Sequence, residues 1–207
     1  MFSIGEFLDV FIPLFVMIDP FASLALYISL TGNMDENEKR KTRYESTLYG
    51  FIILLFFAFV GEYILSLFGI SIEALEIAGG ILILLIGIEM VREGDKPKIS
   101  KKGEESYQES GDVGIVPLAT PMLAGPGAIS LVIILMKSHS YIIVLSAMAI
   151  VFCIVYIFFA YSDRVFRFLG LKGSRAFTRI LGLLVAAFAV QYILNGISGW
   201  LVSVLHV

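Results

Sequence analysis

Residues 117–130 read Pro117-Leu-Ala-Thr-Pro-Met-Leu-Ala-Gly-Pro-Gly-Ala-Ile-Ser130, with three prolines and two glycines inside an apolar segment. That segment, roughly 113–137, is long enough to cross a bilayer as a helix. Proline lacks a backbone N–H and disfavours helix in the residue before it, so each proline frees backbone polar groups. In lipid, protein, water or ligand must satisfy those groups. The run therefore predicts a broken membrane helix with exposed peptide groups near its middle.

The composition of the whole chain is that of a membrane protein. Of its 207 residues, 58% are hydrophobic and 16% are charged, and the mean hydropathy is +0.89. A soluble domain is about 45–50% apolar and about 25% charged, so this apolar excess is too large for one water-facing domain. The net charge of −3 gives no support to nucleic-acid binding. One cysteine and two histidines exclude a disulfide framework and a Cys/His metal cluster.

The apolar residues occur in long unbroken runs, which indicate helices, whereas barrel strands would alternate in short segments. We expect an all-α, polytopic membrane protein with six transmembrane helices at roughly 6–30, 43–68, 73–92, 113–137, 140–162 and 177–204.

The basic residues predict the orientation of these spans. Of the 15 Lys and Arg residues, all except Lys137 fall in or beside loops 1–2, 3–4 and 5–6. The positive-inside rule places these three loops in the cytoplasm and both termini outside. We expect a multi-pass protein of the cell (plasma) membrane.

A polar segment, 94–113, divides the chain into two halves of three spans each, 1–93 and 114–207. Its composition is typical of a flexible cytoplasmic linker, which we favour over a regulatory site.

The two halves resemble each other weakly but in the same order. Asp19-Pro20-Phe21-Ala22 aligns with Gly125-Pro126-Gly127-Ala128, and Phe68-Gly69-Ile70 aligns with Leu169-Gly170-Leu171. Because each half has an odd number of spans, the two three-helix repeats must be inverted relative to each other in one membrane domain. Inverted repeats with broken helices, here spans 1 and 4, are a recurring plan of transporters.

The break in span 1 has a carboxylate at its centre. A single proline is more often an ordinary kink, but two interruptions at matching places favour paired breaks. Asp19 followed by Pro20 is the usual order of an N-cap and the first helical residue. We expect the Asp19 carboxylate to accept hydrogen bonds from the amides of Ala22 or Ser23. Asp19 is also the candidate for carrying a proton, a role compatible with capping.

The break in span 4 offers donors instead. Its cap position is Gly125, which has no side chain, so the amides of Gly127 and Ala128 are free to bind an anion at the positive end of the helix dipole. The Ser130 hydroxyl, one turn on, could contribute. We therefore hypothesise a site for a zwitterion, with its carboxylate toward Gly125–Ser130 and its ammonium toward Asp19.

Three further polar residues complete the expected site. Thr120 is a candidate ligand contact or gate. Gln191 and Asn195, on one face of span 6, either form hydrogen bonds between helices or line the pocket. The expected substrate-binding residues are Asp19, Pro20, Ser23, Thr120, Pro121, Gly125, Pro126, Gly127, Ala128, Ser130, Gln191 and Asn195.

The residues at both breaks resemble the MarC/SnatA family of integral membrane proteins. Pro117–Ser130 is similar to that family's PLAxPxLxGPGAIS stretch, and Asp19-Pro20 with Ser29-Leu30-Thr31 is similar to DPxGNxPxxxSLT. Within the second stretch, the family's Gly, Asn and Pro are replaced by Ala22, Ser23 and Ala25.

The resemblance implies a secondary transporter of small neutral amino acids such as glycine and alanine, coupled to a proton gradient in preference to sodium. Similarity to the wider LysE-like group leaves export of amino acids, other small metabolites or drugs as an alternative. A channel is also open, as is homo-oligomerisation. We expect no cofactor. An intramembrane enzyme is disfavoured because both histidines lie near span ends and Asp19 has no acidic partner at its depth.

Overall fold

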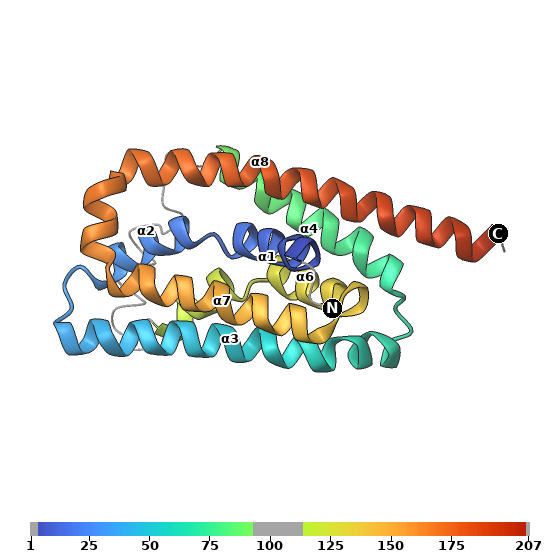
Figure 1. Ribbon diagram of the computed structural model, residues 1–207, viewed down its shortest axis with the longest axis horizontal. Helices are drawn as coiled ribbons and strands as arrows, with labels where there is room; N and C mark the ends of the chain where they lie inside the picture. The colour runs from blue at the N-terminus through green and yellow to red at the C-terminus, as the bar shows by residue number, and fades with distance from the viewer. Residues whose placement is uncertain (1–3, 93–113, 206–207) are drawn as a thin grey trace.

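The computed structural model describes residues 4–92 and 114–205, and every regular element in those ranges is helical (Figure 1). The predicted linker, 94–113, lies outside the described residues. In chain order the elements are α1 (Ile4–Ile18), α2 (Pro20–Thr31), α3 (Glu36–Leu67), α4 (Ile72–Arg92), the π-helix η1 (Gly114–Leu123), α6 (Pro126–Ser138), α7 (Tyr141–Ala160) and α8 (Ser162–Leu205).

Five segments of the described chain are long and apolar enough to cross a membrane: α1 with α2, then α3, α4, α7, and residues Thr178–Val204 of α8. These correspond to five of the six predicted spans. The predicted fourth span, 113–137, is divided between η1 and α6, and α6 has only 13 residues. The helical membrane class is therefore confirmed, and the fourth span is interrupted where its prolines predicted.

The long helices α3 and α8 form two edges of the molecule, and α1 and α2 run between them (Figure 1). α1 packs against α6, α7 and α8, so the first break is enclosed by protein. α8 contains a kink at Gly170, which has φ 61° and ψ 174°. This left-handed conformation suits glycine, because a side chain there would be strained.

Glycines allow α4 and α8 to approach at backbone distance. A Cβ atom added to Gly87 of α4 would lie 2.8 Å from the Ala186 nitrogen and 2.9 Å from the Gly182 oxygen, both on α8. A Cβ at Gly182 would lie 2.6 Å from Cβ of Met90 on α4. Small residues at such crossings are how membrane helices gain packing contacts without a hydrophobic driving force.

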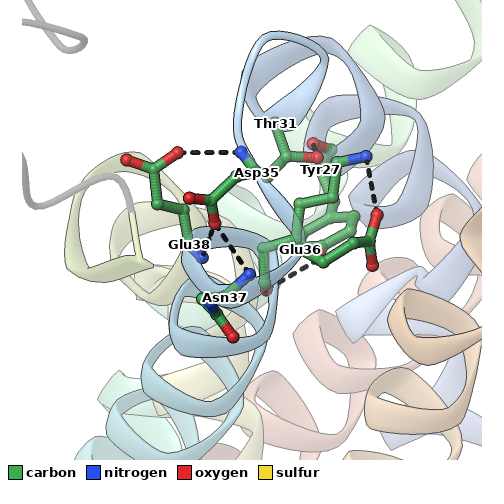
Figure 2. A network of polar contacts seen from close by, with 7 residues as sticks. Tyr27, Thr31, Asp35, Glu36, Asn37 and Glu38 are labelled. Atoms are coloured by element: carbon green, nitrogen blue, oxygen red, sulfur yellow. Dashed lines mark hydrogen bonds and ion pairs between the residues drawn. The ribbon is translucent and has the colours of Figure 1, made fainter.

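The turn between α2 and α3 is fixed by the network in Figure 2. The Asp35 side chain accepts from the Glu38 amide at 2.9 Å, and the Glu38 side chain accepts from the Asp35 amide at 2.9 Å, which forms a capping box. The Tyr27 hydroxyl donates to the Lys39 carbonyl at 2.9 Å, and the Thr31 hydroxyl donates to the Tyr27 carbonyl at 2.7 Å. The Tyr27 bond joins α2 to the start of α3, and the other bonds fix the end of α2 and the cap of α3.

The α4–α8 crossing yields a stability prediction. Replacing Gly87 by Ala places a methyl group against backbone atoms that cannot move aside, so we expect a loss of roughly 1–3 kcal/mol and a lower melting temperature in detergent. The control is Gly32→Ala, because a Cβ at Gly32 would come no closer than 3.5 Å to its neighbours. Equal melting temperatures for the two variants would contradict the close crossing.

Candidate functional site

Asp19 interrupts the first broken helix in a left-handed conformation. Its φ is 43° and its ψ is 78°, and it is the one non-glycine residue in the described ranges with positive φ. Its Oδ1 atom accepts from the amides of Phe21 and Ala22, each at 3.2 Å. The predicted cap is thus confirmed at Ala22, while Phe21 takes the place considered for Ser23. Both bonds offset the strain of positive φ, which Asp tolerates better than most residues.

The same break leaves backbone carbonyls without their usual donors. A continuous helix would pair the Phe21 amide with the Met17 carbonyl, but here that amide donates to Asp19. The Ile18 carbonyl is satisfied instead by the buried Ser23 hydroxyl, at 3.1 Å. Ser23 therefore bridges the break through its side chain. Among the described residues no backbone amide outside the helix donates to the Met17 carbonyl, which could accept from a ligand.

The second carboxylate oxygen of Asp19, Oδ2, lacks the hydrogen bonds that Oδ1 receives. Asp19 is only 4% exposed. The Thr178 hydroxyl of α8 faces this carboxylate, yet within the described ranges Oδ2 is buried and receives no hydrogen bond. A buried polar atom without a partner is costly. Oδ2 is therefore placed to take a proton or to meet a cationic group.

The second break has the opposite character. η1 ends at Leu123, and the Ala124 amide donates to the Ala119 carbonyl at 2.9 Å, a five-residue span typical of a π-turn. Gly125 is extended, with φ −80° and ψ 170°, and supplies no side-chain cap to α6. This confirms the predicted uncapped start. Gly127 is buried near the helix N-terminus, where the dipole favours negative charge.

The two breaks adjoin through a methionine. Met17 precedes Asp19 by two residues, and its Cε lies where a Cβ on Gly127 would stand. Ile86 Cδ1 and Ile83 Cγ1 of α4 lie 2.9 and 3.4 Å from the same position. Any larger residue at 127 would therefore displace these side chains, and Met17 covers the start of α6.

A small cavity lies beside this contact. Its volume is about 10 Å³, and its lining comes from four helices: Pro13, Met17, Ile83, Leu131, Val185, Phe188 and Tyr192. This volume holds about one water molecule. An amino acid does not fit in this volume.

The remaining predicted site residues differ in their burial and in the helix that they face. Ser130 is buried, but it faces α4: a Cβ on Gly79 would lie 2.9 Å from Ser130 Cβ. Pro20 and Ala128 are buried beside their own breaks, whereas Pro126 is exposed. Thr120 is half-buried in η1, the helix that also contains Pro121.

Gln191 and Asn195 do not line this region. Both side chains are exposed on α8, where Gln191 Nε2 donates to Asn195 Oδ1 at 2.8 Å. The cavity is lined instead by Phe188 and Tyr192, on a neighbouring face of the same helix. The expectation that the two amides line the pocket is corrected, because the rotation of α8 turns them outward.

Sequence reasoning missed four neighbours of the breaks. Met17 and Thr178 are a common apolar residue and a lone hydroxyl, and nothing in their own positions marked them. Phe188 and Tyr192 are four residues apart, which does predict a shared helix face, but aromatic residues are abundant in this chain.

Comparison with known proteins places these features in a family. The sequence pattern of the MarC family integral membrane proteins matches residues 4–201. A UPF0056 membrane protein of Methanocaldococcus jannaschii is 39% identical over 197 residues, covering 93% of this chain and 96% of the relative. No solved structure matches the chain.

Two bacterial relatives match the chain over a similar share of its length. The UPF0056 membrane protein YhcE of Escherichia coli is 36% identical over 205 residues, covering 96% of this chain and 94% of the relative. The UPF0056 inner membrane protein MarC of Salmonella paratyphi A is 32% identical over 213 residues, covering 94% of each chain.

The cap at Asp19 yields a stability prediction. In Asp19→Asn, the amide oxygen can keep both bonds and Asn tolerates the left-handed conformation, so we expect a melting temperature close to wild type. Asp19→Ala loses the cap, roughly 0.5–2 kcal/mol, and adds strain of about 1 kcal/mol or more. A melting temperature for the Asn variant as low as that for the Ala variant would show that Oδ1 does not hold the break.

Proposed function

Because the chain belongs to the MarC family of integral membrane proteins, we propose that it is a secondary transporter of small neutral amino acids that works by alternating access. One observation carries the proposal: a buried carboxylate and an uncapped helix N-terminus lie at two adjoining helix breaks. Paired breaks of this kind are where transporters bind their substrates.

The two breaks are chemically complementary to a zwitterion. The Gly127 and Ala128 amides, at the positive end of the α6 dipole, suit a carboxylate. The Asp19 Oδ2 atom and the Met17 carbonyl suit an ammonium group. The apolar residues around the cavity favour a substrate whose side chain is absent or a methyl group, such as glycine or alanine.

Met17 is the element that must move for substrate to bind. Its side chain fills the space in front of Gly127, and methionine is flexible enough to change rotamer at low cost. In the proposed cycle, substrate displaces Met17 and enlarges the small cavity beside it. The conformation with Met17 in place is then the substrate-free, occluded state of a carrier.

Two observations support an inverted repeat of three spans in each half. The breaks at Asp19 and Gly125 occupy aligned positions in the two halves. Gly69 and Gly170, which also align, both have left-handed φ angles, of 67° and 61°. We infer that η1 and α6 together form the fourth of six spans and that the halves rock about the breaks.

The distribution of Lys and Arg supports cytoplasmic loops 1–2, 3–4 and 5–6 with both termini outside. The name of the Salmonella relative, an inner membrane protein, supports a place in the plasma membrane. A proton is the proposed coupling ion, because Asp19 is the ionisable side chain at the breaks.

The transport assay uses the purified chain in liposomes with labelled glycine or alanine, under an imposed proton or sodium gradient. We expect saturable uptake that is driven by the proton gradient and shows counterflow. Unitary currents without saturation would indicate a channel instead. Transport of substrate in the export direction only would indicate an exporter. Sodium-driven uptake would contradict proton coupling.

Asp19→Asn tests the coupling. Because Asn cannot take up and release a proton, we expect loss of proton-driven accumulation while labelled exchange at equal concentrations continues. The matched control is Asp9→Asn, an exposed carboxylate on α1, the helix that precedes Asp19, which we expect to accumulate substrate normally. Proton-driven uptake by Asp19→Asn equal to wild type would remove Asp19 from the coupling mechanism.

Gly125→Ser tests the anion site. The backbone angles of Gly125 are those of an ordinary cap residue, so a serine hydroxyl there would occupy the α6 amides. We expect glycine to bind roughly tenfold more weakly, the loss of about one hydrogen bond to a charged group. Glycinamide, which lacks the carboxylate, should be less affected as a competitor.

The control for this variant is Ser140→Gly, which changes the cap residue of α7, where the serine side chain makes no cap hydrogen bond. Its uptake should equal that of wild type. An unchanged KM for glycine in Gly125→Ser would mean that the carboxylate binds elsewhere.

A further inference from the structure

The outer face of α8 carries a stripe of exposed residues, with polar and small side chains at its centre, along a membrane-spanning segment. Its members are exposed and recur every three or four residues, so they share one side of the helix: Leu184, Ala187, Gln191, Asn195, Ser198 and Val202. We call this set the α8 stripe. Gln191 lies midway along the span Thr178–Val204, where a lipid-facing amide is costly.

The amide pair in the stripe is only partly satisfied. Gln191 Nε2 donates to Asn195 Oδ1 at 2.8 Å. Within the described ranges this is the one hydrogen bond of either side chain, so the Gln191 oxygen and the Asn195 amino group have no partner. One acceptor oxygen and three N–H donors therefore face outward at mid-depth.

The lipid-facing surface of α7 differs from this one. On α7 the large exposed side chains within the span are apolar, as at Ile142, Ile150 and Ile157. By mean hydropathy and buried share the α8 span resembles α3 and α4, so the amide pair, and not the overall composition, sets this face apart.

We propose that the α8 stripe is the interface between two copies of this chain. An amide both donates and accepts, so a two-fold axis beside Gln191 lets the free groups of one copy bind the free groups of the other. Ala187 and Ser198, on either side of the amides, are small enough for two helices to approach closely. α8 also forms an edge of the molecule (Figure 1), where a second copy can reach it.

Cysteine cross-linking in native membranes tests the geometry. In a Cys153→Ser background, Ala187→Cys and Ser198→Cys should form disulfide-linked dimers on mild oxidation. Ile197→Cys on the flank of α8 and Ile150→Cys on α7 are the controls, exposed to a similar degree, and should remain monomeric. Equal cross-linking at all four positions, or none at the stripe, would overturn the proposal.

Subunit counting by single-molecule photobleaching in liposomes tests the energetic role of the amides. Gln191→Leu with Asn195→Leu should weaken dimerisation roughly tenfold, the effect of one or two membrane hydrogen bonds. Val190→Leu on the same helix should not weaken it. A double variant that remains as dimeric as wild type but loses amino-acid uptake would overturn the proposal, because the amides would then serve the substrate path.

Discussion

A backbone polar group that leaves its helix inside a bilayer must find another partner, and this requirement organises the centre of the protein. At the first break the chain meets it internally, since the Asp19 side chain takes two amides and the Ser23 hydroxyl takes a carbonyl. At the second break Gly125 offers nothing to the start of α6. The first break is therefore satisfied in part by its own side chains, with Asp19 Oδ2 left over, whereas the start of α6 has no side-chain cap.

Close packing decides how these breaks can act. Glycines bring α4 against α8 at backbone distance, which leaves little freedom at that crossing. Between the breaks, by contrast, the contact to Gly127 is made by the end of a methionine. The α4–α8 crossing is rigid, whereas the Met17 side chain beside Gly127 is flexible. Movement of Met17 would therefore open a small region while the surrounding helices keep their contacts. Such a division suits the carrier proposed above.

The same constraint acts on the surface. The amides of the α8 stripe are polar groups in a membrane span that the described part of one chain does not fully satisfy. At the centre of the protein the unsatisfied groups suit a small zwitterion, whereas on α8 they lie on an outer face and suit a second copy. Location, rather than residue type, separates the proposed transport role from the proposed assembly role.

The sequence by itself determined the helical membrane class, the places of both breaks and the chemistry of their caps, because proline and glycine act on the local backbone wherever they stand. Asp19 followed by Pro20 and Gly125 followed by Pro126 needed no knowledge of the fold. Only the tertiary structure decided that Met17 covers Gly127, that Ser130 turns to α4 and that Gln191 and Asn195 face outward. Those outcomes depend on how each helix is rotated against its neighbours, and in an almost uniformly apolar span the residue pattern hardly constrains that rotation.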